Sequence, residues 1–183
     1  MTVTPTFIAD VYIIDPVVFK DKRGFFYEFF NQEKFEQLTS QNIQFIQDNL
    51  AASQRGVLRG LHFQKAPFGQ AKLVSVIKGS ALDVVVDLRR NSKTFGHYFS
   101  IVLSATNKKQ LFMPRGVAHA YLSLEDHTLF FYKIDNSYHP ESESGIRFDD
   151  PDLKIDWQTD ISQVILSEKD RNLPYLKDIT DFL

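Results

Sequence analysis

Short apolar runs, many of them rich in β-branched residues, recur along the chain and are separated by turns that contain Gly, Pro, Asn or Asp. Runs of this length and composition are typical of β-strands, and their regular recurrence is typical of antiparallel sandwiches and barrels. We predict strands over residues 11–14, 24–30, 72–77, 81–88, 98–103, 110–113, 120–124 and 129–134. Long helices do not alternate with these runs, which argues against a Rossmann-like sheet. The pattern therefore predicts an all-β fold.

Helical signals are confined to a few short segments. Asn31 to Gln41 is the best early candidate, because Asn31 can cap the helix and Phe35 and Leu38 fall on one face. The chain from Ile161 onward is predicted to be helical or irregular, and residues 167–170 match a helix capping box.

Composition narrows the class of protein. A chain of 183 residues is expected to form a single domain over residues 1–183. Its 17 phenylalanines predict a core lined by rings. The net charge of −2 gives no global positive field that would indicate nucleic acid or a membrane surface, so any cationic site must be local.

The absence of cysteine and of a long apolar run excludes further classes of protein. Without cysteine, the chain has no disulfides, thiolate nucleophile or Cys-ligated zinc. No apolar run approaches the ~18 residues of a membrane span, and Met1 to Pro5 do not resemble a signal peptide. We therefore expect a cytoplasmic protein without a membrane partner.

Two histidines, each beside a β-type run, are the first candidates for chemistry. His62 ends the segment Arg59-Gly60-Leu61-His62, and His119 ends a second segment that begins at Pro114. A lone strand histidine is usually a core residue, but here a cation and a glycine accompany it. Side chains alternate along a strand, so Arg59 reaches the cavity of His62 only through its length or through a bend at Gly60.

The other candidates each have an ordinary structural interpretation. Tyr132 either fills a core position or donates a proton, Asp170 belongs to the capping box, and Tyr138 is a loop aromatic that packs on the surface or stacks on a planar ligand. Single cations are usually solvated surface charges, although guanidinium groups suit a pyrophosphate. The cations in question are Arg23, Arg59, Lys72, Arg115 and Lys169.

A metal site is not favoured by the spacing of the histidines. Metal-binding cupin-type barrels usually present His-x-His with a nearby Glu and a later His, and no His-x-His occurs in this chain. We predict no metal.

Eight sequence blocks, taken together in their order and spacing, resemble the dTDP-4-dehydrorhamnose 3,5-epimerase family from about Phe7 to Pro174. These blocks are residues 23–28, 47–49, 57–64, 70–74, 83–89, 114–119, 131–133 and 169–170. The resemblance implies a cupin-like jelly roll with a few short helices, a homodimer, no cofactor, and dTDP-4-dehydro-6-deoxy-D-glucose as substrate. The implied product is dTDP-4-dehydro-L-rhamnose.

The resemblance also implies roles for individual residues. His62 matches the general base, Tyr132 the general acid, Asp170 the carboxylate that pairs with the base, and Lys72 and His119 match groups around the sugar ketone. Tyr138 matches an aromatic that stacks on thymine. The nucleotide and pyrophosphate contacts match Arg23, Glu28, Gln47, Asn49, Arg59, Glu143 and Lys169.

The chain departs from the family pattern at Ala71, Ser80, Arg115 and Ala120. Arg115 and Ala120 are expected to border the sugar pocket and to bear on the substrate and the stereochemical outcome. No departure removes a group of the implied acid–base set.

The implied chemistry is sound in elementary terms. A C4 ketone acidifies the hydrogens on C3 and C5, because either carbanion delocalises onto oxygen. An imidazole, with an ordinary pKa of about 6.5, is a competent base at neutral pH, and a phenol, with an ordinary pKa of about 10, can return a proton from the other face. A lysine can stabilise the oxyanion. The reaction needs no redox cofactor, because the oxidation state does not change.

Three alternatives stay open. An epimerase acting at C3 alone or at C5 alone would use the same groups. A non-catalytic cupin that binds sugar nucleotides is disfavoured because His62, Asp170 and Tyr132 form a full acid–base set. A metal-dependent cupin dioxygenase is disfavoured by the absent His-x-His.

Overall fold

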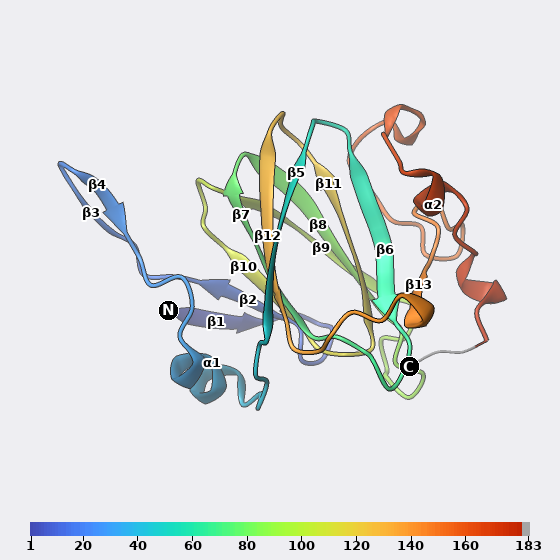
Figure 1. The fold of residues 1–183 in the computed structure, drawn as a ribbon, viewed down its shortest axis with the longest axis horizontal. Helices are drawn as coiled ribbons and strands as arrows, with labels where there is room; N and C mark the ends of the chain where they lie inside the picture. The colour runs from blue at the N-terminus through green and yellow to red at the C-terminus, as the bar shows by residue number, and fades with distance from the viewer. Residues whose placement is uncertain (181–183) are drawn as a thin grey trace.

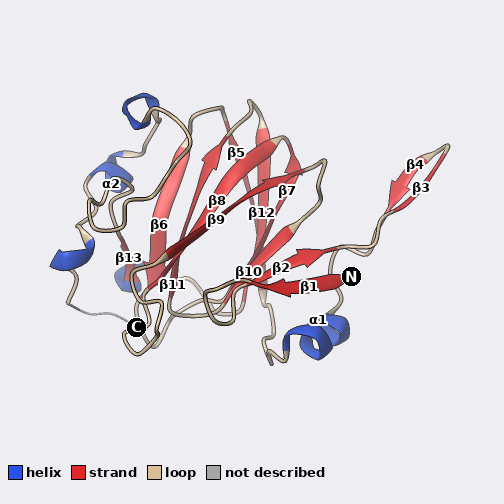
Figure 2. Cartoon of the chain, turned by 180° about the vertical axis from the view of Figure 1, so that it is seen from behind, coloured by secondary structure: helices blue, strands red, loops and turns tan. Residues whose placement is uncertain are grey.

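Two antiparallel β-sheets face each other in the computed structural model, which describes residues 1–180 (Figure 1, Figure 2). The first sheet has the order β1 (Thr2–Pro5), β2 (Tyr12–Asp15), β10 (Gln110–Met113), β7 (Lys72–Lys78), β12 (Thr128–Ile134) and β5 (Gln47–Ser53). The second has the order β13 (Glu143–Gly145), β6 (Leu58–Gln64), β11 (Val117–Ser123), β8 (Ser80–Asp87) and β9 (Tyr98–Ser104). The predicted all-β, jelly-roll class is confirmed.

Because side chains alternate along each strand, the second sheet has a hydrophobic core on each of its two faces. On β8, Leu82, Val84 and Val86 belong to a cluster on the outer face, which the C-terminal segment covers with Phe148 and Trp157. The intervening side chains point between the sheets, where the second cluster draws its residues from β7, β10 and β12 as well as β8 and β11. Charged residues on the inward face of the second sheet are therefore enclosed by the sandwich.

One α-helix of two turns packs against the edge of the first sheet. Helix α1 (Gln32–Thr39) begins as predicted, with the Asn31 side chain accepting a hydrogen bond from the amide of Lys34 at 3.0 Å. Phe35 is buried against Phe112 of β10, with ring centroids 5.0 Å apart. Leu38 was expected on the same face but is 47% exposed, because the helix turns Phe35 and Thr39 inward.

The C-terminal segment lies along the second sheet as short helical turns, as the sequence predicted (Figure 2). These are η2 (Ile161–Gln163), α2 (Glu168–Arg171) and η3 (Leu176–Asp178), and η1 (Pro140–Ser142) precedes β13. Within residues 1–180, none of the helices has both the length and the apolar character that a membrane crossing requires.

A projecting hairpin is the main departure from the predicted elements. The strand expected over residues 24–30 ends at Phe26, and β3 (Phe19–Asp21) and β4 (Gly24–Phe26) form a separate two-stranded hairpin that extends from the body (Figure 1). Its rings are exposed, so the expectation of a core lined by phenylalanine holds only in part. Four strands of the two sheets also lie outside the predicted ranges: β1, β6, β13, and the polar edge strand β5, which has no apolar run to mark it.

A bulge in β6 decides which way its side chains point. His62 pairs with His119, but Arg59 pairs with Tyr121, so three steps along β6 match two steps along β11. Because paired residues share a face of the sheet, the extra residue brings Arg59 and His62 to the same side. Of the two ways in which Arg59 could reach the cavity of His62, its length or a bend at Gly60, the bend is therefore present.

Glycine is required at this bulge. Gly60 has φ +116°, and a Cβ there would lie 2.5 Å from the His119 carbonyl oxygen and 2.7 Å from Ala120. Backbone atoms cannot yield in the way that the end of a flexible side chain can.

We predict that Gly60→Ala lowers the free energy of unfolding by about 2 kcal/mol or more, since backbone strain and overpacking add. Gly56→Ala is the matched control, because Gly56 also has a positive φ (+81°) but a Cβ there meets only one atom, at 3.8 Å. Urea unfolding of both variants measures the difference. Equal losses would show that close packing at Gly60 contributes nothing.

Candidate active site

A short contact between an imidazole and a carboxylate joins the second sheet to the C-terminal segment. His62 Nε2 on β6 lies 2.5 Å from Asp170 Oδ1 on α2, and the Asp170 side chain is 4% exposed. Ser167 caps α2 by accepting a hydrogen bond from the Asp170 amide at 3.0 Å. The capping interpretation of this segment is therefore correct, and the cap also fixes the carboxylate that meets His62.

The charge of Asp170 determines the tautomer of the neutral ring. Burial raises the Asp170 pKa, but hydrogen bonds from His62 and Ser167, together with the charge of His62, more than offset this and hold the pKa below its usual value. An ionised carboxylate only accepts hydrogen bonds, so Nε2 of His62 carries the hydrogen. Nδ1 is left with a lone pair that can take a proton.

Lys72 and His119 share the neighbourhood of a fully buried carboxylate. Asp83 on β8 accepts from His119 Nε2 at 2.8 Å, and its other oxygen has no hydrogen-bond partner among the described residues. Burial lowers the pKa of Lys72 to about 8, against the charges of Asp83 and Glu143, which raise it. The ammonium is thus mostly charged at neutral pH but loses its proton under mildly alkaline conditions.

Tyr132 lies on the same sheet as Lys72 and faces His62 and His119, which belong to the other sheet. It lies on β12, two residues after Phe130, whose ring stacks on Tyr121 of β11 with centroids 3.9 Å apart and planes 2° apart. Burial is the main cause of a raised Tyr132 pKa, which Tyr121 and Glu143 raise further and Arg59 lowers. The phenol therefore keeps its proton at neutral pH and can donate it.

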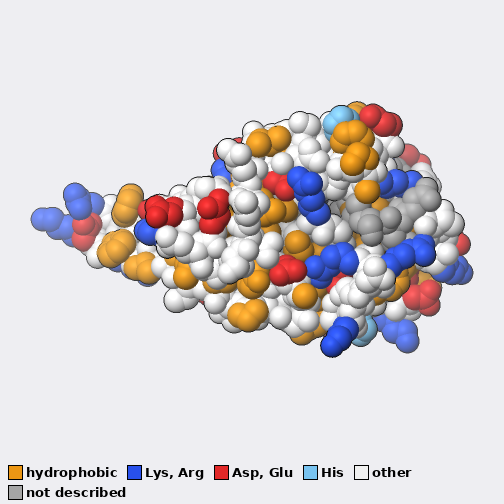
Figure 3. Space-filling model, turned by 90° about the horizontal axis from the view of Figure 1, so that it is seen from below, with side chains coloured by type: hydrophobic (Ala, Val, Ile, Leu, Met, Phe, Trp, Pro, Cys, Tyr) orange, Lys and Arg blue, Asp and Glu red, His pale blue; other side chains and the backbone are white. Residues whose placement is uncertain are grey.

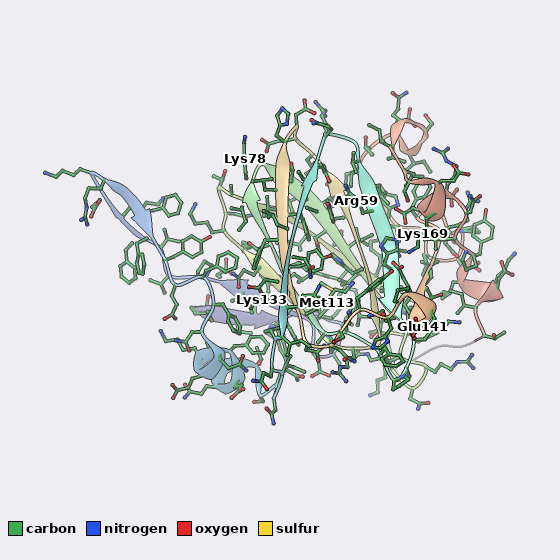
Figure 4. The ribbon with its side chains drawn as sticks, in the orientation of Figure 1. Arg59, Lys78, Met113, Lys133, Glu141 and Lys169 are labelled. Atoms are coloured by element: carbon green, nitrogen blue, oxygen red, sulfur yellow. The ribbon has the colours of Figure 1, made fainter. Side chains whose placement is uncertain are left out.

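Two cavities meet at His62, Lys72 and Tyr132. The first, of about 270 Å³, is lined by Ala51, Arg59, His62, Lys72, His119, Tyr121, Phe130, Tyr132, Ser167, Lys169 and Asp170. The second, of about 280 Å³, is lined by Gln47, Asn49, His62, Phe63, Gln64, Gln70, Lys72, Tyr132, Ile134, Tyr138 and Glu143. Figure 4 shows Arg59 and Lys169 at the β6 side of the molecule, where the first cavity lies.

Polar groups in the second cavity are partly paired and partly free. Tyr138 donates to Glu143 at 2.5 Å, and Lys169 forms an ion pair with the same carboxylate. Gln47 donates to Asn49 Oδ1 at 2.8 Å, while the buried Nδ2 of Asn49 has no partner in residues 1–180. That amide can donate to a bound ligand.

Two predicted binding residues lie outside both cavities. Arg23 lies in the turn between β3 and β4, with its side chain 84% exposed and paired with Asp21 at 2.6 Å. Lys and Arg side chains gather at the end of the projection in the space-filling view (Figure 3). Glu28 follows the hairpin and pairs with Lys34 at 2.8 Å. Within one chain, the expected contact of these residues with the other site groups is absent, because the hairpin is directed away from the body.

The expectation that Arg115 and Ala120 border the pocket is wrong. Arg115 pairs with Asp135 at 2.9 Å and lines neither cavity. Ala120 belongs to the outer core cluster, because it lies on the opposite face of β11 from His119 and Tyr121.

Sequence reasoning missed Asp83, Tyr121 and Ser167 as parts of the site. A charged residue within the apolar run 81–88 was an available signal for Asp83. Tyr121 gave none, because an aromatic residue in an apolar strand looks like any core residue. Among the described residues no group of three or more His, Asp or Glu is arranged to hold a metal ion, and the absence of a metal stays a prediction.

Comparison with known proteins points to one family. A profile described as dTDP-4-dehydrorhamnose 3,5-epimerase matches residues 5–178. A protein of that name from Escherichia coli K12 is 49% identical over 180 residues, covering 98% of this chain and 96% of its own. A crystal structure of one from Elizabethkingia anophelis has a TM-score of 0.94 at 52% identity, covering 97% of each chain. The Legionella pneumophila dTDP-6-deoxy-D-glucose-3,5-epimerase in complex with dTDP-4-keto-L-rhamnose has a TM-score of 0.94 at 44% identity, covering 98% of this chain and 94% of its own.

We predict that Lys72 titrates near pH 8, being charged below that pH and neutral above it. Side-chain NMR of labelled lysine measures this directly. Asp83→Asn should lower the Lys72 pKa further, and by more than Glu143→Gln, because Asp83 is the stronger of the two charges that raise it. A Lys72 pKa at the ordinary 10.5 would contradict the burial on which the prediction rests.

Proposed function

This chain belongs to the dTDP-4-dehydrorhamnose 3,5-epimerase family, and we propose that it inverts C3 and C5 of dTDP-4-dehydro-6-deoxy-D-glucose to give dTDP-4-dehydro-L-rhamnose. The chain is an isomerase of the epimerase type that acts in the dTDP-rhamnose pathway. We assign the whole activity to a single domain spanning residues 1–183. One observation carries the proposal: an imidazole, an ammonium and a phenol from facing sheets meet at the junction of two cavities.

Proton removal is assigned to His62. Its Nε2 is held by Asp170 at 2.5 Å, so Nδ1 acts as the base, and the imidazolium that forms is stabilised by the same carboxylate. The base belongs to the second sheet. Tyr132 belongs to the first sheet and returns a proton from the opposite side of the sugar. A base and an acid on opposite walls are the minimum that inversion requires.

Lys72 and His119 are assigned to the ketone oxygen. Burial lowers the pKa of Lys72, and an ammonium that is partly removed from water stabilises negative charge on an enolate oxygen more strongly than it would in water. Asp83 holds His119 at 2.8 Å and so fixes the direction of its ring.

The remaining lining residues are assigned to the nucleotide. Arg59 and Lys169 line the first cavity and bind the diphosphate. Gln47, Asn49 and Glu143 line the second cavity with Tyr138, which stacks on the thymine ring. The Legionella relative of known structure holds a dTDP-sugar, which supports this class of substrate.

We further propose a homodimer in which the β3–β4 hairpin of one protomer supplies Arg23 and Glu28 to the site of the other. The hairpin leaves the body of its own chain and exposes Phe19, Phe25 and Phe26. Such exposed rings are expected to pack against a partner. In this arrangement Arg23 and Glu28 can contact the nucleotide although they lie outside both cavities of their own chain.

The acid–base assignment predicts different defects in two variants. His62→Ala should lose both hydrogen exchange and inversion by about 10² to 10⁴ in rate, because no other group serves as base. Tyr132→Phe should still exchange hydrogen for deuterium, because His62 can remove and return a proton on its own face, but should give little inverted product. Proton NMR of the sugar in deuterated water measures both on one sample.

That experiment also decides between the open alternatives. Exchange at both C3 and C5 supports the double epimerase, exchange at one position indicates a single-site enzyme, and no exchange indicates a non-catalytic binding protein. Normal inversion by a folded Tyr132→Phe protein would rule out Tyr132 as the acid.

The dimer assignment predicts complementation between two defective chains. Arg23→Ala should weaken dTDP binding by about tenfold or more, the usual consequence of losing a charge-assisted contact. A heterodimer of Arg23→Ala with His62→Ala should regain activity at low substrate concentration, because one site then has an intact His62 and receives an intact hairpin.

The matched control is a heterodimer of His62→Ala with Tyr132→Phe. Both residues line the cavity of their own chain, so each site keeps one defect and activity should not return. Equal behaviour of the two mixtures would show that the hairpin does not act on a partner.

A further inference from the structure

Three polar side chains, Arg59, Ser53 and Tyr121, form a hydrogen-bonded chain beside the first cavity, and of these the assignments above use only Arg59. Arg59 Nε donates to Ser53 Oγ at 3.2 Å, and Ser53 Oγ lies 3.0 Å from the Tyr121 hydroxyl. Arg59 also donates to the Ala52 carbonyl at 3.4 Å, and its side-chain partners recorded within residues 1–180 are this carbonyl and Ser53, both uncharged. Its charge is therefore available to an anionic ligand.

Counting hydrogens shows that this chain has one unused donor. Ser53 and Tyr121 carry one hydroxyl hydrogen each, and only one of the two lies in the contact between them. Ser53 already accepts from the Arg59 cation, and a hydroxyl polarised in this way is a better donor to the next group. Either hydroxyl can be the donor in this contact, and in the arrangement in which Ser53 donates, the Tyr121 hydrogen has no acceptor recorded among the described residues.

The Tyr121 ring is held by stacking at the wall of the first cavity. The ring stacks on Phe130 at 3.9 Å, is 4% exposed, and lines the first cavity beside Arg59. With the ring fixed, only rotation about the C–O bond is free. Ser53 does not line this cavity, so the phenol is the member of the pair that a ligand there can reach.

We propose that Tyr121 donates its phenolic hydrogen to a diphosphate oxygen of the nucleotide bound by Arg59, and that Ser53 positions both groups. The nature of the ligand rests on the proposed function. The hydrogen-bond relay from Arg59 through Ser53 to Tyr121 rests on its own distances. A ligand oxygen completes the relay by accepting the one remaining hydrogen.

Calorimetric titration with dTDP and NMR titration with thymidine, which lacks the diphosphate, test this. Tyr121→Phe keeps the stacked ring and removes only the hydroxyl, so dTDP affinity should fall about tenfold or more while thymidine affinity stays within about twofold. Ser53→Ala should also weaken dTDP binding. The double variant should lose less than the product of the two single losses, because both act on one chain of hydrogen bonds.

Tyr98→Phe is the matched control. The Tyr98 hydroxyl accepts from the Asp156 amide at 3.2 Å and its ring packs on the outer core, away from both cavities, so dTDP affinity should not change. Thermal unfolding of each variant reports on folding independently of binding.

The outcomes separate this inference from the proposed function. If wild type binds dTDP and a folded Tyr121→Phe protein binds it equally well, the inference is overturned and the proposed function stands. If Tyr121→Phe weakens thymidine and dTDP alike, the phenol shapes the pocket and does not contact the diphosphate, which also overturns the inference. If the wild-type protein does not bind dTDP, both the proposed function and this inference are overturned.

Discussion

The close approach of β6 to β11 at Gly60 is the constraint on which the cavity depends. A residue with a side chain would meet the His119 carbonyl at 2.5 Å, so the strands reach this distance only with glycine. The bulge that results places Arg59 and His62 on the same face of the sheet as their partners on β11, Tyr121 and His119. A regular strand would turn Arg59 into the outer core, and the interior would lose its unpaired cation. The geometry of the whole first cavity follows from this one irregularity.

Charge compensation explains how so many ionisable groups occupy the interior. Asp170 meets His62, Asp83 meets His119, and Glu143 meets Lys169. Buried carboxylates without such partners would be costly. The second oxygen of Asp83 has no partner within the described chain. Two donors that line the cavities, the charge of Arg59 and the amide Nδ2 of Asn49, are also incompletely satisfied there. They lie in different cavities, as expected if one ligand extends across both.

The fold separates the acid–base groups from part of the predicted nucleotide site. The acid–base groups come from β6, β7, β12 and α2, which pack together in one body. Arg23 lies on a hairpin whose two strands pair only with each other. Such a hairpin has little to stabilise it in isolation. Its exposed rings and its distance from the cavities are both accounted for if a second protomer covers it.

The sequence by itself determined the fold class, because strands such as β7, β8 and β12 carry runs of β-branched or aromatic residues, and such runs are a local signal. It did not reveal β5, an edge strand whose polar residues need no burial signal. Family motifs nominated His62, Lys72, Tyr132 and Asp170, and the structure brings these four together. Only the tertiary structure decided that Arg59 joins them, that Arg23 does not, and that Tyr121 faces the cavity. Those outcomes depend on strand register, on a bulge and on which face of a sheet is enclosed. These are relations between segments far apart in the chain, so the local pattern of apolar and polar residues does not encode them.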